Sequence, residues 1–330
     1  TVRCGNGSKE FIESITPVAN TEIQALACRA GSLNSAVSKF SYKQANEGIS
    51  FSPASGSLIT EGSREILING TGSATVCLST EIQPQCQISF DGQASCITGT
   101  TGNSNSISVS ENFSMFATLC DKGLIKEISA NYDVPAPEPK LLLAGSELSG
   151  SQVFSFEQQL DLSLLAIDGK NQNATICYTQ DGSQPDCSIN EANRSICTQG
   201  SLYSGPLAIN SPVKLYAQAC MPNKVSSAVS SFQINFNLPQ PTLSIPDGTV
   251  MEPTANQVAL EKHSSIPNAK ICYTTDQSQP ACGLVNGTFG CANGTEYNAP
   301  ITITQATQVK AATCQDGYIG SSVASAQYSL

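Results

Sequence analysis

The residues of this chain best suited to chemistry are its 14 cysteines, most of which recur at regular spacing. Three sets of four stand out, and the positions in each set are numbered first to fourth. The sets are Cys77, Cys86, Cys96 and Cys120; Cys177, Cys187, Cys197 and Cys220; and Cys272, Cys282, Cys291 and Cys314. No Cys-x-x-Cys pair occurs, so the spacing does not favour a zinc site. It predicts structural disulfides formed in an oxidising compartment.

The sequence contains few candidate residues for a catalytic or metal site. The single histidine, His263, lies in a Lys-His-Ser-Ser turn that the other repeats lack, which argues against a triad built on it. Asp181 and Asp186 could act as an acid and base pair or hold calcium. However, the third repeat keeps Asp276 and has Ala281 at the second place, and Asp-Gly is typical of a tight turn. We therefore expect no enzyme activity, no metal and no cofactor.

Seven Asn-x-Ser/Thr sequons are candidate N-glycosylation sites. They begin at Asn6, Asn69, Asn112, Asn173, Asn193, Asn286 and Asn293. Asn6 and Asn293 each follow an equivalent cysteine by two residues, and most of the others fall in expected loops or near strand ends. Together with the cysteines, the sequons predict a secreted or cell-surface glycoprotein.

The sequence contains internal repeats, and the elements that position the cysteines and the sequon asparagines belong to these repeats. The stretch 174–220 has a close copy at 269–314 and a more diverged copy at 74–120. The last part of a fourth copy lies at 4–28, where Cys4 matches a third cysteine and Cys28 a fourth. A tandem array of one small module is therefore predicted.

Proline-rich segments at 133–139 and 238–241 divide the array, because proline holds the chain extended and is excluded from central strands. The expected parts are the back half of an incomplete β-sandwich module at 1–43 and three complete modules. We call these the first, second and third modules, at 44–135, 136–237 and 238–330. An isolated pair of strands is marginal in water, so we expect another segment or chain to complete the half module.

Within each module, apolar and polar residues alternate with period two in short runs bounded by Gly, Pro, Asn and Ser. This pattern predicts an all-β sandwich of about seven strands. In the strand that ends at Cys220, the set Leu215, Ala217 and Ala219 should face the core. Cys220 and Cys177 should both lie on the outer face of the same sheet.

Four cysteines allow three connectivities, and strand alternation favours first to fourth with second to third. The preferred pairs are Cys77–Cys120, Cys86–Cys96, Cys177–Cys220, Cys187–Cys197, Cys272–Cys314 and Cys282–Cys291. The competing scheme joins first to second and third to fourth, which would let Cys4 pair with Cys28. Under the preferred scheme, those two need partners from the missing half module.

The composition limits the classes of partner that the chain is expected to bind. A formal charge of −10 argues against nucleic acid, which calls for clustered Lys and Arg. No apolar run is long enough to cross a bilayer. The chain has no Trp and only 6% aromatic residues, so it offers little for stacking on sugar rings.

Three repeated segments carry a resemblance to a known family: Ala-x-Ile-Cys-Tyr-Thr-x-Asp-Gly-Ser-x-Pro, Leu-Tyr-Ser-Gly-Pro-Leu-x-Ile and Val-Lys-Leu-Tyr-Ala. They resemble the chitobiase/β-hexosaminidase C-terminal-type module, a fibronectin-III-like or immunoglobulin-like β-sandwich. The first module is looser, because Glu81-Ile-Gln-Pro replaces the Asp-Gly-Ser-x-Pro run. The resemblance implies tandem immunoglobulin/fibronectin-III-like sandwiches in an extracellular setting and brings no active site. Four cysteines per module depart from that family.

These observations favour a structural subunit of an extracellular glycoprotein fibre or surface appendage. Its expected partners are copies of itself in a homopolymer and covalent N-glycans, with no nucleic acid and no membrane span. An adhesin or carbohydrate-binding stalk is an open alternative, as are accessory modules of a secreted glycoside hydrolase.

Overall fold

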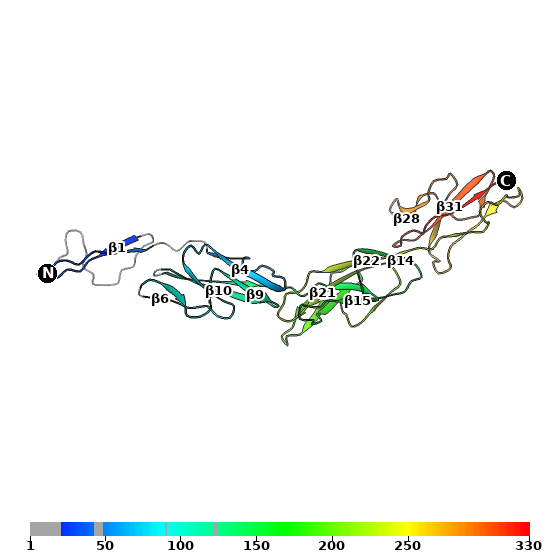
Figure 1. Ribbon diagram of the computed structural model, residues 1–330. Helices are drawn as coiled ribbons and strands as arrows, with labels where there is room; N and C mark the ends of the chain where they lie inside the picture. The colour runs from blue at the N-terminus through cyan, green and yellow to red at the C-terminus, as the bar shows by residue number, and fades with distance from the viewer. Residues whose placement is uncertain (1–20, 43–48, 90, 122–123) are drawn as a thin grey trace. The chain divides into compact units, whose positions relative to one another are not determined.

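A computed structural model of the chain describes residues 21–42, 49–89, 91–121 and 124–330 (Figure 1). All regular elements in these ranges are β-strands, which confirms the all-β prediction. The described residues contain no helix long and apolar enough to span a membrane. The chain forms two compact units, one up to residue 135 together with 223–225, and the other from 136–222 and 226–330.

Three apolar cores lie along the chain, one in the first unit and two in the second. The first core draws its buried residues from 51–134, the second from 136–236 and the third from 251–328. Each therefore falls within one of the three modules predicted as complete. The module boundaries themselves stay predictions.

The first core lies between a three-stranded sheet, β3-β4-β9, and a four-stranded sheet, β11-β10-β5-β8. Ile66 and Ile68 of β4 pack with Met115 and Ala117 of β10, because alternate residues of a strand face the same side. The strands are β3 (Ser50–Ser52), β4 (Gly62–Asn69), β5 (Thr75–Ser79), β6 (Cys86–Ile88), β7 (Ala94–Cys96), β8 (Thr100–Thr101), β9 (Ser104–Val109), β10 (Phe113–Asp121) and β11 (Leu124–Tyr132). β6 and β7 form a separate hairpin.

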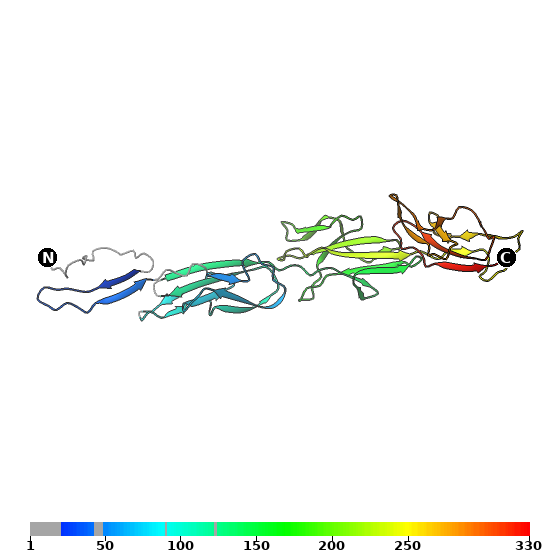
Figure 2. The same cartoon turned by 90° about the horizontal axis from the view of Figure 1, so that it is seen from above.

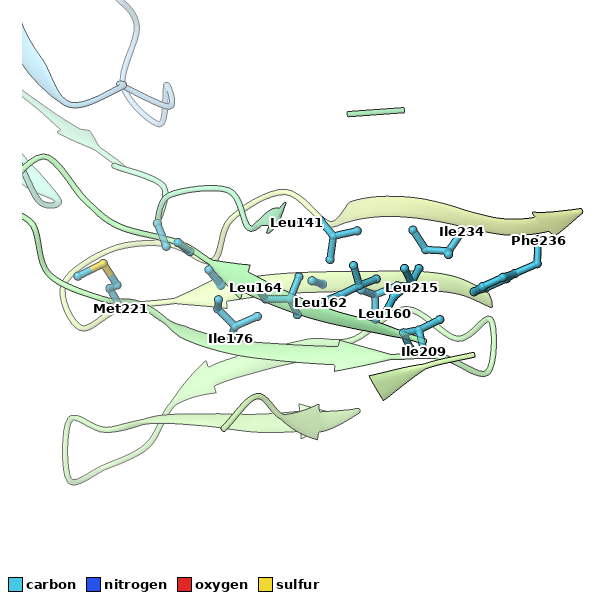
Figure 3. Close-up of a cluster of buried hydrophobic side chains, with 14 residues drawn as sticks. Leu141, Leu160, Leu162, Leu164, Ile176, Ile209, Leu215, Met221, Ile234 and Phe236 are labelled. Atoms are coloured by element: carbon cyan, nitrogen blue, oxygen red, sulfur yellow. The ribbon is translucent and has the colours of Figure 1, made fainter. Parts of the chain in front are cut away.

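The second core lies between the sheets β13-β12-β15-β20 and β14-β22-β21-β16-β19. Figure 3 shows Leu160, Leu162 and Leu164 of β15 meeting Leu215 of β21 and Ile234 of β22. The strands are β12 (Lys140–Leu143), β13 (Ser146–Leu148), β14 (Ser151–Ser155), β15 (Leu160–Leu165), β16 (Thr175–Thr179), β17 (Asp186–Ile189), β18 (Ser195–Gln199), β19 (Ser201–Leu202), β20 (Leu207–Ile209), β21 (Val213–Cys220) and β22 (Ser230–Asn237). All pairs are antiparallel except β14 with β22.

The third core repeats this plan with shorter strands. Its main sheet is β29-β26-β31-β32, accompanied by the pairs β23-β25, β24-β30 and β27-β28. The strands are β23 (Thr242–Leu243), β24 (Gln257–Val258), β25 (Leu260–Glu261), β26 (Lys270–Thr274), β27 (Ala281–Val285), β28 (Thr288–Asn293), β29 (Thr295–Glu296), β30 (Ile301–Thr302), β31 (Thr307–Cys314) and β32 (Ala324–Tyr328).

A buried tyrosine closes the first and third cores in the same way. The Tyr132 hydroxyl donates a hydrogen bond to the Pro53 carbonyl at 2.7 Å, and the Tyr328 hydroxyl donates one to the Ile245 carbonyl at 2.7 Å. A buried hydroxyl needs such a partner, since an unpaired one loses its bonds to water without compensation. Burial raises the pKa of Tyr132 to about 12.

The face predicted for the strand ending at Cys220 is confirmed, because Leu215, Ala217 and Ala219 are fully buried in the second core. Cys177 and Cys220 are buried as well. They lie on the opposite face of the sheet, where they form a small cluster with Cys187 of the β17–β18 hairpin. Figure 2 shows this hairpin as a separate layer beside the sheet.

We expect Leu215→Ala to destabilise the second module by about 2–5 kcal/mol, because the smaller side chain leaves a cavity in a closed core. Hydrogen exchange at β16 and β22 amides of the full chain should then accelerate by at least about 30-fold. Leu202→Ala is the control, since Leu202 is exposed and its truncation should change stability by less than about 0.5 kcal/mol. Equal protection in the two variants would contradict this assignment of the core.

Candidate functional site

The cysteines pair first to third and second to fourth in every complete module, so the preferred pairing is wrong, and so is the competing scheme. The bonds are Cys77–Cys96, Cys86–Cys120, Cys177–Cys197, Cys187–Cys220, Cys272–Cys291 and Cys282–Cys314. The predicted pairs Cys77–Cys120, Cys86–Cys96, Cys177–Cys220, Cys187–Cys197, Cys272–Cys314 and Cys282–Cys291 are not formed.

Geometry explains the correction. Cys187 and Cys197 are cross-strand neighbours in the β17–β18 hairpin, and this hairpin lies over the sheet that carries Cys177 and Cys220. Each hairpin cysteine therefore meets a sheet cysteine across the gap between the layers. In the third module the Cys272 and Cys314 sulfurs are 3.3 Å apart, so the two bridges run side by side.

Each bridge closes a span of 19 to 34 residues, which corresponds to a stabilisation of about 3 kcal/mol. Cys28 is also disulfide-bonded. Cys4 lies outside the described residues, and its pairing with Cys28 or with a missing half module stays a prediction.

The candidate glycosylation sites in the described residues all have exposed asparagines. These are Asn69, Asn112, Asn173, Asn193, Asn286 and Asn293, whereas Asn6 lies outside the described residues. Asn193 and Asn286 have positive φ values, which marks tight turns open to solvent. Asn293 donates a hydrogen bond from Nδ2 to the Gln279 carbonyl at 2.6 Å. Glycosylation itself stays a prediction at all seven sites.

The acidic residues weighed as a catalytic or calcium pair accept hydrogen bonds from different partners. Asp181 accepts hydrogen bonds from the Ser183 hydroxyl at 2.6 Å and from its N–H at 3.0 Å. Asp186 accepts one from Thr198 across the β17–β18 hairpin. In the described residues, no group of three or more His, Cys, Asp and Glu side chains could hold a metal ion. His263 lies 3.3 Å from a Glu157 carboxylate oxygen, and both side chains are largely exposed.

The Asp181 turn recurs at Asp276, which accepts bonds from the Ser278 hydroxyl at 2.6 Å and its N–H at 3.1 Å. The side-chain bond from the serine is the main cause that lowers the pKa of each aspartate below its usual 3.8. This cause is local, because a carboxylate that accepts two hydrogen bonds resists protonation. The repeated motif thus shapes a turn.

The recurring tyrosines belong to the cores rather than to an exposed platform. Tyr178 and Tyr203 meet edge to face at 6.4 Å against the second core, and Tyr273 and Tyr297 do the same at 6.3 Å against the third. Ring pairs of this kind stabilise a core through complementary edges and faces.

The N-terminal hairpin is the feature most relevant to function. β1 (Thr21–Ala25) pairs with β2 (Ser38–Tyr42) in the register that β21 has with β22, so Ile23 opposite Phe40 corresponds to Leu215 opposite Phe232. Leu215 is fully buried, yet Ile23 is half-buried and Phe40 is 52% exposed. Among the described residues, the core face of this hairpin is therefore less covered than that of β21 and β22.

The second edge of β1 has no partner strand among the described residues. In the second module β21 pairs with β22 on one side and β16 on the other, whereas β1 pairs only with β2 among the described residues. An open edge presents unpaired N–H and C=O groups that can template another strand. Sequence analysis identified the half module by its match to a module end, but it did not single out Phe40. The signal was available in the alternation of residues 38–42.

We expect peptide mapping without reduction to recover Cys177 linked to Cys197 and Cys187 linked to Cys220, because the hairpin crosses the sheet. Cleavage before Asp181, after Arg194 and after Lys214 separates all four cysteines of the second module. A peptide joining Cys177 to Cys220 would contradict the described pairing.

We expect Ser278→Ala to raise the pKa of Asp276 toward its usual value, since the largest stabilising hydrogen bond is lost. Because the folded pKa is depressed, the turn is stabilised above the unfolded pKa, and this is lost as pH falls through the lower folded pKa. Carboxyl carbon chemical shifts followed against pH measure the change. Ser183→Ala is the control and should move only Asp181.

Comparison with known proteins supports the module fold. The family model described as Fn3 associated matches residues 165–234 and 258–328, which lie in the second and third modules. The specific chitobiase-type assignment has no such support. No curated protein matches the chain.

Several solved structures of tandem immunoglobulin or fibronectin-III-like domains are similar to the chain. Drosophila OTK extracellular domains 3–5 share 12% identity, covering 86% of this chain and 98% of that one, with a TM-score of 0.25. Titin domains I67–I69, in an E-to-A variant, share 12% over 83% and 93%, with a TM-score of 0.23. Clostridium thermocellum CbhA fibronectin(III)-like modules share 11% over 57% and 93%, with a TM-score of 0.22. At these scores nothing about function follows.

Proposed function

We propose that this chain is a structural subunit of an extracellular glycoprotein fibre or surface appendage, built by contacts between modules. The observation that carries the proposal is the β1–β2 hairpin, which has the register of a module's last two strands and a core-face residue, Phe40, that is 52% exposed. Another segment or another copy of the chain completes this half module. When another copy supplies the completing segment, the two subunits are joined.

Completion of the half module by further strands is energetically favourable. A two-stranded hairpin is marginal in water, and further strands or a packed face are needed to stabilise it. Phe40 is 52% exposed, so covering the rest of its ring would contribute about 0.8–1.5 kcal/mol, roughly half the value for burying a fully exposed ring. A strand added at the β1 edge would also satisfy main-chain groups, as in other cases of strand addition. Both gains arise at the same place.

The setting is extracellular in this proposal. Six described disulfides stabilise the three modules, and such bonds persist in oxidising compartments. The exposed sequon asparagines are positioned to carry N-glycans. We also propose that the chain is not an enzyme, since Asp181 and Asp276 serve turns and His263 pairs with an exposed glutamate.

An adhesin is a second candidate, favoured by the tip of the β27–β28 hairpin. Leu284 and Val285 are both exposed there, next to the turn at Asn286. The corresponding β17–β18 hairpin of the second module has a polar turn through Asn190 and Asn193. An apolar tip on one module and a polar tip on another would suit a chain that binds a partner through a single module.

We expect Phe40→Asp to weaken self-association of the full chain at least tenfold. When a neighbour covers this face in the assembly, the new carboxylate would be buried without a partner. Sedimentation velocity and negative-stain microscopy measure the effect. Leu202→Asp is the matched control, since it puts the same charge on an exposed leucine outside the half module. Wild-type chains that stay monomeric at high concentration and form no fibre would refute the proposal.

A further inference from the structure

A loop after the fourth cysteine recurs in three places, and we call it the joint loop. Its copies are residues 28–36, 220–228 and 314–322. The same two hydrogen bonds close its base each time. The N–H of Ser35, Ser227 and Ser321 donates to the carbonyl of Ala27, Ala219 and Thr313 at 3.0, 2.9 and 3.0 Å, respectively. The N–H of Ala27, Ala219 and Thr313 donates back to the serine Oγ at 2.8, 2.9 and 2.8 Å.

Two copies of the joint loop pair with the end of a module's last strand. In the first unit, the Val225 N–H donates to the Val134 carbonyl at 3.0 Å. In the second unit, the Ile319 N–H donates to the Phe236 carbonyl at 3.0 Å, and the Leu238 N–H donates to the Ile319 carbonyl at 3.0 Å. Both loop residues stand five positions after the fourth cysteine.

The two acceptor carbonyls are equivalent by strand register. Met115 lies five residues before its fourth cysteine and pairs with Ala130, four residues before Val134. Leu215 holds the same place before Cys220 and pairs with Phe232, four residues before Phe236. The third module repeats the rule, because Val309 pairs with Ala326, four residues before Leu330. Leu330 is therefore the third module's acceptor position.

Side chains next to the paired residue add a second contact, with different chemistry in each case. Lys224 forms an ion pair with Glu61, and the lysine side chain is almost fully buried. Tyr318 packs on Phe156 with ring centroids 5.9 Å apart, beside an apolar cluster of Leu238 and neighbouring residues. The main-chain pairing is the shared feature.

The N-terminal copy of the loop is complete but unoccupied by the described residues. Leu33 stands five positions after Cys28, as Val225 and Ile319 do after their cysteines. Its side chain is 98% exposed, and the structure gives its N–H no hydrogen bond to a described residue. By comparison, Ile319 is 42% exposed in its occupied joint.

We infer that the 28–36 loop is an intermolecular joint that binds the end of β32 in a second copy of this chain, with Leu33 pairing at Leu330. The inference rests on the proposed function and names the partner surface. Leu33 keeps the position that makes the joint twice within the chain, and Leu330 keeps the acceptor position. Leu330 is 47% exposed and Leu33 is 98% exposed.

Charge favours the same partner. Arg29 is the only charged residue of the 28–36 loop, and it is exposed. Glu252 lies two residues after Val250, which bridges Ser329, just before the acceptor position. Glu61 stands in a similar place, three residues after Leu58, which bridges Asp133. A cation from the loop and a carboxylate beside the strand end would thus lie near each other, although Ser32 rather than Arg29 holds the position of Lys224.

The test places a photo-cross-linking amino acid, benzoylphenylalanine, at position 33 of the full chain and mixes unlabelled with ¹⁵N-labelled copies. The expected result is a cross-link to peptides containing residues 325–330 of the other isotope. The same amino acid at position 202, another exposed leucine, is the control and should not give that cross-link. Cross-links confined to one copy, or to any other segment, would overturn the inference.

Variants supply an independent measurement. Leu33→Asp should weaken self-association at least tenfold, and Leu202→Asp should leave it unchanged. Arg29→Glu should weaken it less, and Arg29→Glu with Glu252→Arg should recover part of the loss. Circular dichroism and disulfide mapping verify the fold of each variant. Association that persists unchanged in Leu33→Asp would overturn the joint while leaving Phe40-dependent completion intact. An absence of association in the wild-type chain would refute both.

Discussion

Two disulfides hold a hairpin against the outer face of a sheet in each complete module, and the rest of the module depends on this arrangement. The sheet strands β16 and β21 carry the first and fourth cysteines, and the hairpin β17–β18 carries the second and third. The hairpin covers a face that would otherwise meet water. Small sandwiches bury limited apolar area, so covalent bonds of about 3 kcal/mol each form a large share of their stability.

The strand that ends at the fourth cysteine links this covalent layer to the apolar core. One face of β21 presents Leu215, Ala217 and Ala219 to the core, while Cys220 belongs to the opposite face. The strand also pairs with a neighbour on each side. β1 has the same alternation and the same register with its partner, but it lacks the second neighbour among the described residues. Within the described part of the chain, β1 therefore lacks the neighbour that β16 provides to β21 in the second module.

The joint loop keeps the same backbone hydrogen bonds in each copy, while the side chains beside it make different contacts. Its base is fixed by a serine that both donates and accepts, so the residue two positions before that serine keeps the same place relative to the sheet. A buried lysine paired with Glu61 accompanies one occupied copy, and a tyrosine packed on Phe156 accompanies the other. Burial lowers the pKa of Lys224, because a charged ammonium loses hydration there. Main-chain pairing tolerates this variety, since it requires only an N–H and a carbonyl.

The sequence by itself determined the all-β fold, the repeated modules and the core face of each strand, because period-two alternation depends only on neighbouring residues. It also assigned Asp181 and Asp276 to turns rather than to a catalytic site, since the second acidic residue is not repeated. The tertiary structure alone decided the disulfide pairing. Alternation places Cys177 and Cys220 on one face of a sheet, but it does not say that the β17–β18 hairpin lies over that face. The occupied joints at Val225 and Ile319 likewise pair residues far apart in sequence, and only the folded chain brings them together.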